Sequence, residues 1–85
     1  MKQLFFEIIA EKQFNEWEKQ DKKIFAKIIS LLASARETPF TGIGKPEALK
    51  HELNGYWSRR ITKEHRLVYK VTDKAIIVIS CKFHY

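Results

Sequence analysis

Residues 56–85 constrain the fold most strongly, because three strand-forming segments follow one another with almost no chain between them. They read "YWSRRIT" (56–62), "HRLVYKVT" (65–72) and "KAIIVISCKFHY" (74–85), with polar turns at Thr62–Glu64 and Asp73–Lys74. Connections this short can join only antiparallel neighbours. The sequence therefore predicts a three-strand antiparallel meander.

Residues 2–37 predict one strand followed by two helices. The segment "KQLFFEII" (2–9) is short and rich in β-branched and aromatic residues, which is typical of a strand with one face formed by Leu4, Phe6 and Ile8. Residues 10–20 are mostly charged helix formers that carry Phe14 and Trp17 three positions apart, so Trp17 is expected to pack in the core. Residues 21–37 follow with an amphipathic pattern, for which Asp21 is the expected N-cap and the apolar positions are Ile24, Ile28, Leu31, Leu32 and Ala35.

A loop is predicted over residues 37–55, "ETPFTGIGKPEALKHELNG", which holds both prolines and all three glycines. One short helical turn is expected at 46–53, because proline suits a first helical position. Loops of this length in small domains are usually functional or disordered.

The predicted architecture is α+β, with a single domain over residues 1–85. An N-terminal strand and two helices precede the loop and the meander, and the helices pack on one face of an antiparallel sheet.

Positive charge is concentrated in the second half of the chain. The net charge is +6, and residues 43–85 contribute nine basic and four acidic side chains to it. A basic surface of this kind suits a polyanion such as RNA, because each lysine or arginine set against a phosphate releases counterions. A surface that only keeps the protein soluble is the alternative.

Cysteine and membrane patterns exclude several classes. Cys81 is the single cysteine, so it can form no intramolecular disulfide or cysteine zinc cluster, and its apolar strand context predicts a small buried side chain. No apolar run approaches the ~18 residues of a membrane span. A cytoplasmic protein without a membrane partner is expected.

The basic half contains the groups that metal-independent RNA cleavage needs. Such cleavage requires a base for the 2′-hydroxyl, an acid for the leaving 5′-oxygen and cations for the phosphorane. The candidates are Lys45, Glu47, Lys50, His51, Arg59, Arg60, His65, Arg66, Lys82, His84 and Tyr85. Few carboxylates accompany them, which argues against a Mg²⁺ site, and the histidines lack zinc-ligand spacing. Taken alone, Glu47 is better explained as an acid near the start of a helix, where it stabilises the helix dipole whatever the function.

Strand register decides which of these side chains meet. A turn centred on Lys63–Glu64 would place Ile61 opposite Arg66 and put Arg59 and Arg66 on one face. A two-residue turn at Asp73–Lys74 would then direct His84 to the other face. A one-residue bulge would bring His84 back, and the register stays open on sequence alone.

Ordered motifs resemble those of the YoeB toxins (Txe/YoeB family), within the RelE-like superfamily. The motifs are "GKPE", "LKH", "WSRRI", "EHRLVY" and the final "HY", and the likeness spans essentially the whole chain. The resemblance implies a RelE-like fold and the toxin of a toxin–antitoxin module. It further implies a ribosome-dependent endoribonuclease that cuts messenger RNA in the ribosomal A site, without a metal or another cofactor.

The resemblance also implies roles for individual residues. Glu47 would be the general base, Arg66 would stabilise the transition state, His84 would be the general acid and Tyr85 would support catalysis. RNA phosphates are expected to be bound by Lys45, Lys50, His51 and Arg59.

The implied partners are a YefM-like antitoxin, the ribosome and messenger RNA. The antitoxin should be acidic and fold on binding, and both the 30S and 50S subunits would be contacted. A homodimer is possible in this family. The main alternative is a non-catalytic RNA- or ribosome-binding module, which would not need Glu47 and His84. A toxin aimed at DNA gyrase is disfavoured, because such relatives generally lack the terminal His-Tyr. The intact motifs also argue against an inactive toxin that serves only as a repressor subunit.

Overall fold

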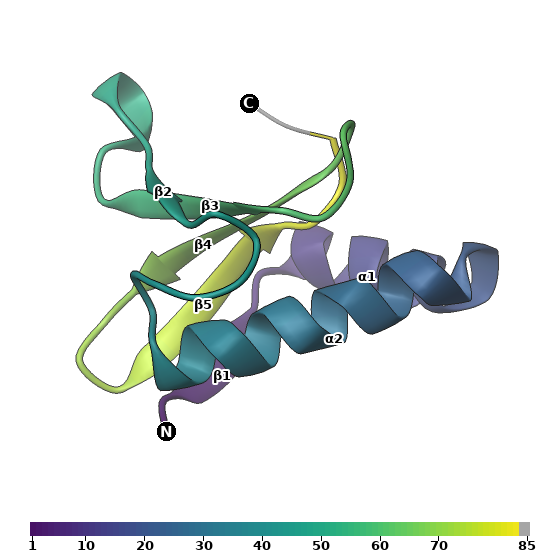
Figure 1. The fold of residues 1–85 in the computed structure, drawn as a ribbon, viewed down its shortest axis with the longest axis horizontal. Coiled ribbons are helices and arrows are strands. Elements are labelled where there is room, and N and C mark those ends of the chain that lie inside the picture. Colours follow the sequence, from purple (N-terminus) through teal and green to yellow (C-terminus); the bar gives the residue numbers. More distant parts are fainter. Residues whose placement is uncertain (84–85) are drawn as a thin grey trace.

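The computed structural model describes residues 1–83 and contains two helices and a five-strand sheet (Figure 1). The helices are α1 (Ile8–Gln20) and α2 (Lys22–Glu37). The strands are β1 (Gln3–Phe6), β2 (Glu47–Ala48), β3 (Tyr56–Arg60), β4 (Arg66–Val71) and β5 (Ala75–Ser80). A short 3₁₀ helix, His51–Leu53, separates β2 from β3.

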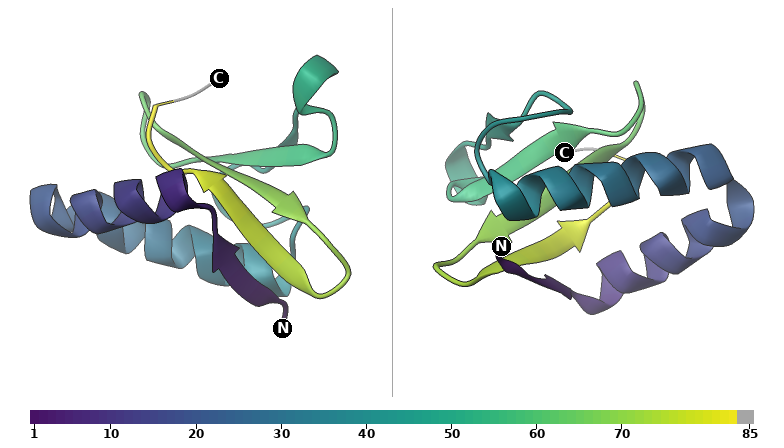
Figure 2. Two further views of the ribbon diagram at one scale, coloured as in Figure 1. Left: turned by 180° about the vertical axis from the view of Figure 1, so that it is seen from behind. Right: turned by 60° about the horizontal axis from the view of Figure 1, so that its bottom comes forward.

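The sheet has the order β1-β5-β4-β3-β2, and both helices cover the same side of it (Figures 1 and 2). Strands β3, β4 and β5 form the predicted antiparallel meander. The α+β architecture is confirmed, with one difference: β1 pairs with β5 in parallel, so the sheet is mixed. A parallel pair needs a crossover, and the two helices together with the chain up to β5 supply it.

Local signals account for both helices. The carboxylate of Asp21 accepts hydrogen bonds from the backbone N–H groups of Lys23 and Ile24, at 3.0 and 3.1 Å, so the predicted N-cap is confirmed. The expected stripe of α2 is buried at Ile28, Leu31, Leu32 and Ala35. Trp17 of α1 is buried as predicted.

Two local predictions are wrong. Ile8 does not extend the first strand; it begins α1 and is 86% exposed. The helical turn expected within residues 46–53 is present as the 3₁₀ helix His51–Leu53, but Pro46 does not start it, because residues 44–49 run beside β3. There the Arg60 N–H donates to the Gly44 carbonyl at 2.7 Å and the Leu49 N–H donates to the Tyr56 carbonyl at 2.9 Å. This pairing satisfies more backbone groups than an isolated turn would.

The β3–β4 register differs by one residue from the predicted one. Arg60, not Ile61, lies opposite Arg66, and Arg59 lies opposite Leu67. The turn itself sets this register, because the Thr62 hydroxyl accepts hydrogen bonds from the N–H groups of Glu64 and His65. As a result, Arg59 and Arg66 lie on opposite faces of the sheet.

A bulge between β4 and β5 shifts the second pairing. Tyr69 pairs with Val78, but Val68 pairs with Ser80, so Ile79 is the extra residue. This is the kind of bulge that the sequence left open. His84, whose direction was at issue, lies outside the described residues.

Candidate active site

The sheet presents two faces with different chemistry. We call the side packed on α1 and α2 the helix face, and its core side chains include Leu67, Tyr69, Ile76 and Val78. The opposite side, the open face, carries the alternate residues of the same strands. By the observed pairing it includes Glu47, Ser58, Arg60, Arg66, Val68 and Lys70.

Glu47 and Arg66 therefore lie on the same face of the sheet. Glu47 pairs with Ser58, Ser58 pairs with Val68, and Arg66 is two residues before Val68 on β4. Strands β2 and β4 are separated by one strand, so their backbones lie roughly 10 Å apart. Glutamate and arginine side chains can both reach a phosphodiester placed between them.

The segment around Glu47 is exposed and irregular on both sides. Glu47 is exposed, as are Lys45, Lys50 and His51. Lys45 and His51 have positive φ angles of 52° and 59°, which non-glycine residues rarely adopt. Unusual backbone geometry of this kind is concentrated at binding and catalytic sites.

Arg66 also contacts the chain that follows β5. Its backbone N–H donates to the carbonyl of Phe83 at 2.9 Å, and the Phe83 N–H donates to Nδ1 of His65 at 2.8 Å. Phe83, the residue before His84, is thus held beside the start of β4. His84 and Tyr85 themselves lie outside the described residues.

Arg59 is a different case, and its predicted RNA contact is contradicted. Its side chain is fully buried on the helix face. All five of its N–H groups are used: Nε donates to the Tyr69 hydroxyl, and the terminal nitrogens donate to the Ser34 hydroxyl and to the carbonyls of Thr38, Thr41 and Ile43, at 2.7–3.0 Å. No donor is left for a phosphate, so Arg59 has a structural role.

The Arg59 side chain fastens residues 38–44 to the end of α2. The carbonyl of Thr38 follows the last helical residue, where the negative end of the helix dipole favours a cation. Gly42 and Gly44 allow the loop to pass this closely, because a Cβ at Gly42 would come within 2.5 Å of the Ser34 hydroxyl. Much of the predicted long loop is therefore fixed in place.

Two buried proton donors of the core have raised pKa values. Burial raises the pKa of Tyr69, although its hydrogen bond from Arg59 opposes the shift; the Tyr69 hydroxyl donates in turn to the Pro39 carbonyl at 2.7 Å. Burial likewise raises the pKa of the Cys81 thiol to about 12. Cys81 is fully buried, as predicted, and its high pKa is that of an unreactive thiol.

Sequence reasoning missed that α1 holds the chain where it leaves β5, at Cys81. Trp17 Nε1 donates to the Cys81 carbonyl at 2.9 Å, and Gln13 Oε1 accepts from the Cys81 N–H at 2.8 Å. The polar tips of tryptophan and glutamine on a mostly apolar stripe were the signal, because buried polar groups require partners.

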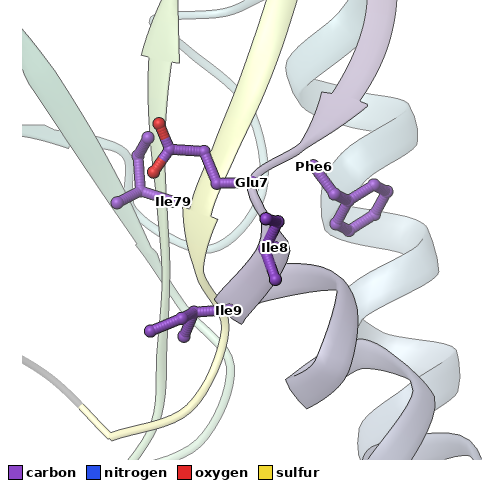
Figure 3. Close-up of a pocket in the computed structure, with 5 residues that line it drawn as sticks. All are labelled: Phe6, Glu7, Ile8, Ile9 and Ile79. Carbon is purple, nitrogen blue, oxygen red and sulfur yellow. The ribbon is translucent and has the colours of Figure 1, made fainter.

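A pocket of about 570 Å³ lies elsewhere, at the junction of β1 and α1 (Figure 3). Ile8 and Ile9 project from the first turn of α1 towards it, and Ile79 lines it from the end of β5. Its lining includes neither Glu47 nor Arg66, so we assign it no catalytic role.

Residues 1–83 present neither a cluster of metal ligands nor a membrane-spanning helix. No three histidine, cysteine or acidic side chains of this part of the chain lie close enough to hold a metal ion together. Neither helix combines the length and the apolar character needed to cross a membrane.

Comparison with known proteins gives a consistent result. The family model described as "YoeB-like toxin of bacterial type II toxin-antitoxin system" matches residues 6–85. Toxin YoeB of Escherichia coli (strain K12) is 56% identical over 69 residues, covering 81% of this chain and 82% of that protein.

Two solved structures from Staphylococcus aureus share the fold over nearly the full length. A YoeB dimer has a TM-score of 0.92 at 46% identity and covers 99% of this chain and 98% of that one. The toxin in a heterotetrameric YoeB–YefM toxin–antitoxin complex has a TM-score of 0.91 at 45% identity and covers 100% and 99%.

Proposed function

The chain belongs to the family of YoeB-like toxins of bacterial type II toxin–antitoxin systems, and from this premise we propose that it is a ribosome-dependent endoribonuclease. It would cut messenger RNA in the ribosomal A site without a metal ion and so stop translation. The observation that carries this proposal is the shared face of Glu47 and Arg66, with Phe83 hydrogen-bonded to the backbone of Arg66.

Each reacting atom of the RNA has a proposed partner. Glu47 takes the proton of the 2′-hydroxyl, and the 2′-oxygen then bonds to the adjacent phosphorus. Arg66 stabilises the charge that gathers on the phosphoryl oxygens. The bond from phosphorus to the 5′-oxygen breaks as His84 supplies a proton to that oxygen, and Tyr85 supports this step. The products are a 2′,3′-cyclic phosphate and a free 5′-hydroxyl.

Exposed lysine and histidine side chains around Glu47 support RNA binding. We assign Lys45, Lys50 and His51 to contacts with phosphates, because all three are exposed in the segment that carries Glu47. Arg60 and Lys70 extend the positive charge over the open face. Binding through such contacts weakens as salt concentration rises.

The proposed partners follow from the relatives. An acidic YefM-like antitoxin that folds on binding would neutralise the basic face, in keeping with the S. aureus complex. A homodimer is proposed on the same grounds from the S. aureus dimer. The ribosome, with both its 30S and 50S subunits, would hold the messenger in position for cleavage.

Primer extension in a cell-free translation reaction tests the function. The wild-type protein is compared with folded Glu47→Gln and His84→Gln variants, with Glu52→Gln as a control because Glu52 is an exposed acid in the nearby 3₁₀ helix. Cuts at ribosome-positioned codons should disappear in the first two variants and persist in the control. Translation arrest without cuts, equal in all four proteins, would contradict the proposal and indicate a non-catalytic ribosome binder.

A further inference from the structure

Residues Cys81–Phe83, which we call the C-terminal segment, leave the sheet but keep their backbone hydrogen bonds. The Cys81 N–H and carbonyl are bonded to Gln13 and Trp17 of α1. The Phe83 N–H donates to His65 Nδ1, and the Phe83 carbonyl accepts from the Arg66 N–H. Three side chains and the backbone N–H of Arg66 thus replace the strand pairing at the point where β5 ends.

His65 lies at the centre of this arrangement. Its ring stands edge-on to Trp17, with centroids 4.8 Å apart, and also lies near the Phe83 ring, at 5.4 Å between centroids. Nδ1 acts as the acceptor of this hydrogen bond, which leaves Nε2 as the nitrogen that carries the ring proton. The sequence placed His65 among the candidates for chemistry but gave it no role.

Phe83 has a backbone conformation that needs such support. Its φ angle is 59°, in the left-handed region, and its side chain is 63% exposed, so burial of the ring does not explain the conformation. Strained residues persist where the surroundings determine them. The bonds from His65 and to Arg66 fix both polar backbone groups of Phe83.

We propose that His65 is a positioning residue of the proposed active site, which holds the backbone of Phe83, the residue that precedes the proposed general acid His84. The inference rests on the proposed function, because it concerns the placement of its general acid. The Cα atoms of consecutive residues lie about 3.8 Å apart, so the position of Phe83 limits where a catalytic group on the next residue can act. Small misplacement of a catalytic group lowers the rate of reaction more than the binding of substrate.

Two variants separate the hydrogen bond from the packing. His65→Phe keeps an aromatic ring beside Trp17 and removes the acceptor. His65→Asn keeps an acceptor near the position of Nδ1 and removes the ring. Thermal unfolding establishes that both variants are folded before any rate is compared.

Amide hydrogen exchange of Phe83, measured by NMR on the whole protein, tests the hydrogen bond directly. We expect exchange to be about tenfold faster in His65→Phe and close to wild type in His65→Asn, as loss of one hydrogen bond predicts. Unchanged exchange in His65→Phe would overturn the proposal, because Phe83 would then be held by other contacts.

Cleavage in the cell-free reaction tests the positioning. His65→Phe should lower the cutting rate at saturating ribosomes about tenfold or more, without changing the ribosome concentration for half-maximal rate, and His65→Asn should restore most of it. Equal cutting by wild type and His65→Phe, or equal losses in the two variants, would refute it while the proposed function stands. If the wild-type protein does not cut at all, the proposed function itself fails, and the positioning role fails with it.

Discussion

Arg59 and Arg66 lie on neighbouring strands but on opposite faces of one sheet, and their surroundings differ completely. Arg59 is fully buried on the helix face, and five uncharged oxygens accept from its guanidinium. Arg66 is half-buried on the open face, in a row with Arg60. The same residue type therefore supports the fold on one face and is available for chemistry on the other, and only the strand register decides which.

The largest expected effect is on stability, from Arg59→Ala. The change removes a fully buried guanidinium and leaves one buried and four partly buried acceptors without their donor, so the free energy of unfolding should fall by about 3–5 kcal/mol. Urea unfolding measures it. Arg60→Ala is the matched control, because Arg60 is the exposed neighbour and should cost no more than about 0.5 kcal/mol. Similar losses of unfolding free energy in the two variants would mean that the two faces do not differ in how much they depend on arginine.

Arg66→Gln should have the opposite profile. Its free energy of unfolding should stay within about 1 kcal/mol of wild type, whereas cutting in the cell-free reaction should fall about 100- to 1000-fold through loss of a donor to the transition state. Primer extension and urea unfolding on the same preparation give both values. A strongly destabilised variant would mean that Arg66, like Arg59, is mainly structural.

Raising the pH should lower the free energy of unfolding through the buried Cys81 thiol. Because the pKa of folded Cys81 is about 12 against 9.0 as the ordinary value, the unfolded chain loses its thiol proton first. The stabilising effect of Cys81 is therefore complete below pH 9 and is lost between pH 9 and 12, by about 1 kcal/mol at pH 10. Burial of Tyr69 acts in the same direction above pH 10. Urea unfolding at several pH values should show a shallower decline in Cys81→Ala, and equal slopes would refute this account.

Ser58 is the residue at which the two faces differ least, and its replacement should change the free energy of unfolding least. It lies on the open face yet is 1% exposed, and its hydroxyl has no hydrogen-bond partner among residues 1–83. Ser58→Ala should leave the free energy of unfolding unchanged or raise it by up to about 1 kcal/mol, because a buried unsatisfied hydroxyl is costly.

Ser80→Ala is the control for Ser58→Ala, since the Ser80 hydroxyl does have partners, in Gln13 and the Lys82 carbonyl. Thermal unfolding should show that Ser80→Ala loses about 1 kcal/mol. A comparable loss in Ser58→Ala would mean that the Ser58 hydroxyl is bonded in solution.

The helices and the meander were predictable because their signals are local. The cap at Asp21, the spacing of apolar residues in α2 and the short turns between strands all lie within a few residues of the structures that they determine. Strand β2 was not predictable in this way. Its two residues are extended only because β3 lies beside them, and that neighbour is not visible in the local pattern.

The site was predictable in its residue types but not in its geometry. Motif resemblance singled out Glu47 and Arg66, and the structure brings both to one face. Whether Arg59 is buried or exposed depends on the β3–β4 register, which differs by one residue from the prediction. The hydrogen bonds of the Thr62 hydroxyl in the turn set that register. The contact of His65 with Phe83 depends on the β5 bulge and on α1, so it could not be predicted from the residues near His65 in the sequence.

The position of β5 in the sheet has a consequence for biosynthesis. This strand lies between β1 and β4, and Gln3 at one end of the chain pairs with Ala75 near the other. A nascent chain that has emerged only as far as β4 contains both helices and Glu47, yet β1 has no strand to join. The sheet closes only after β5 has left the exit tunnel, which also delays the pairing of Arg66 with Phe83.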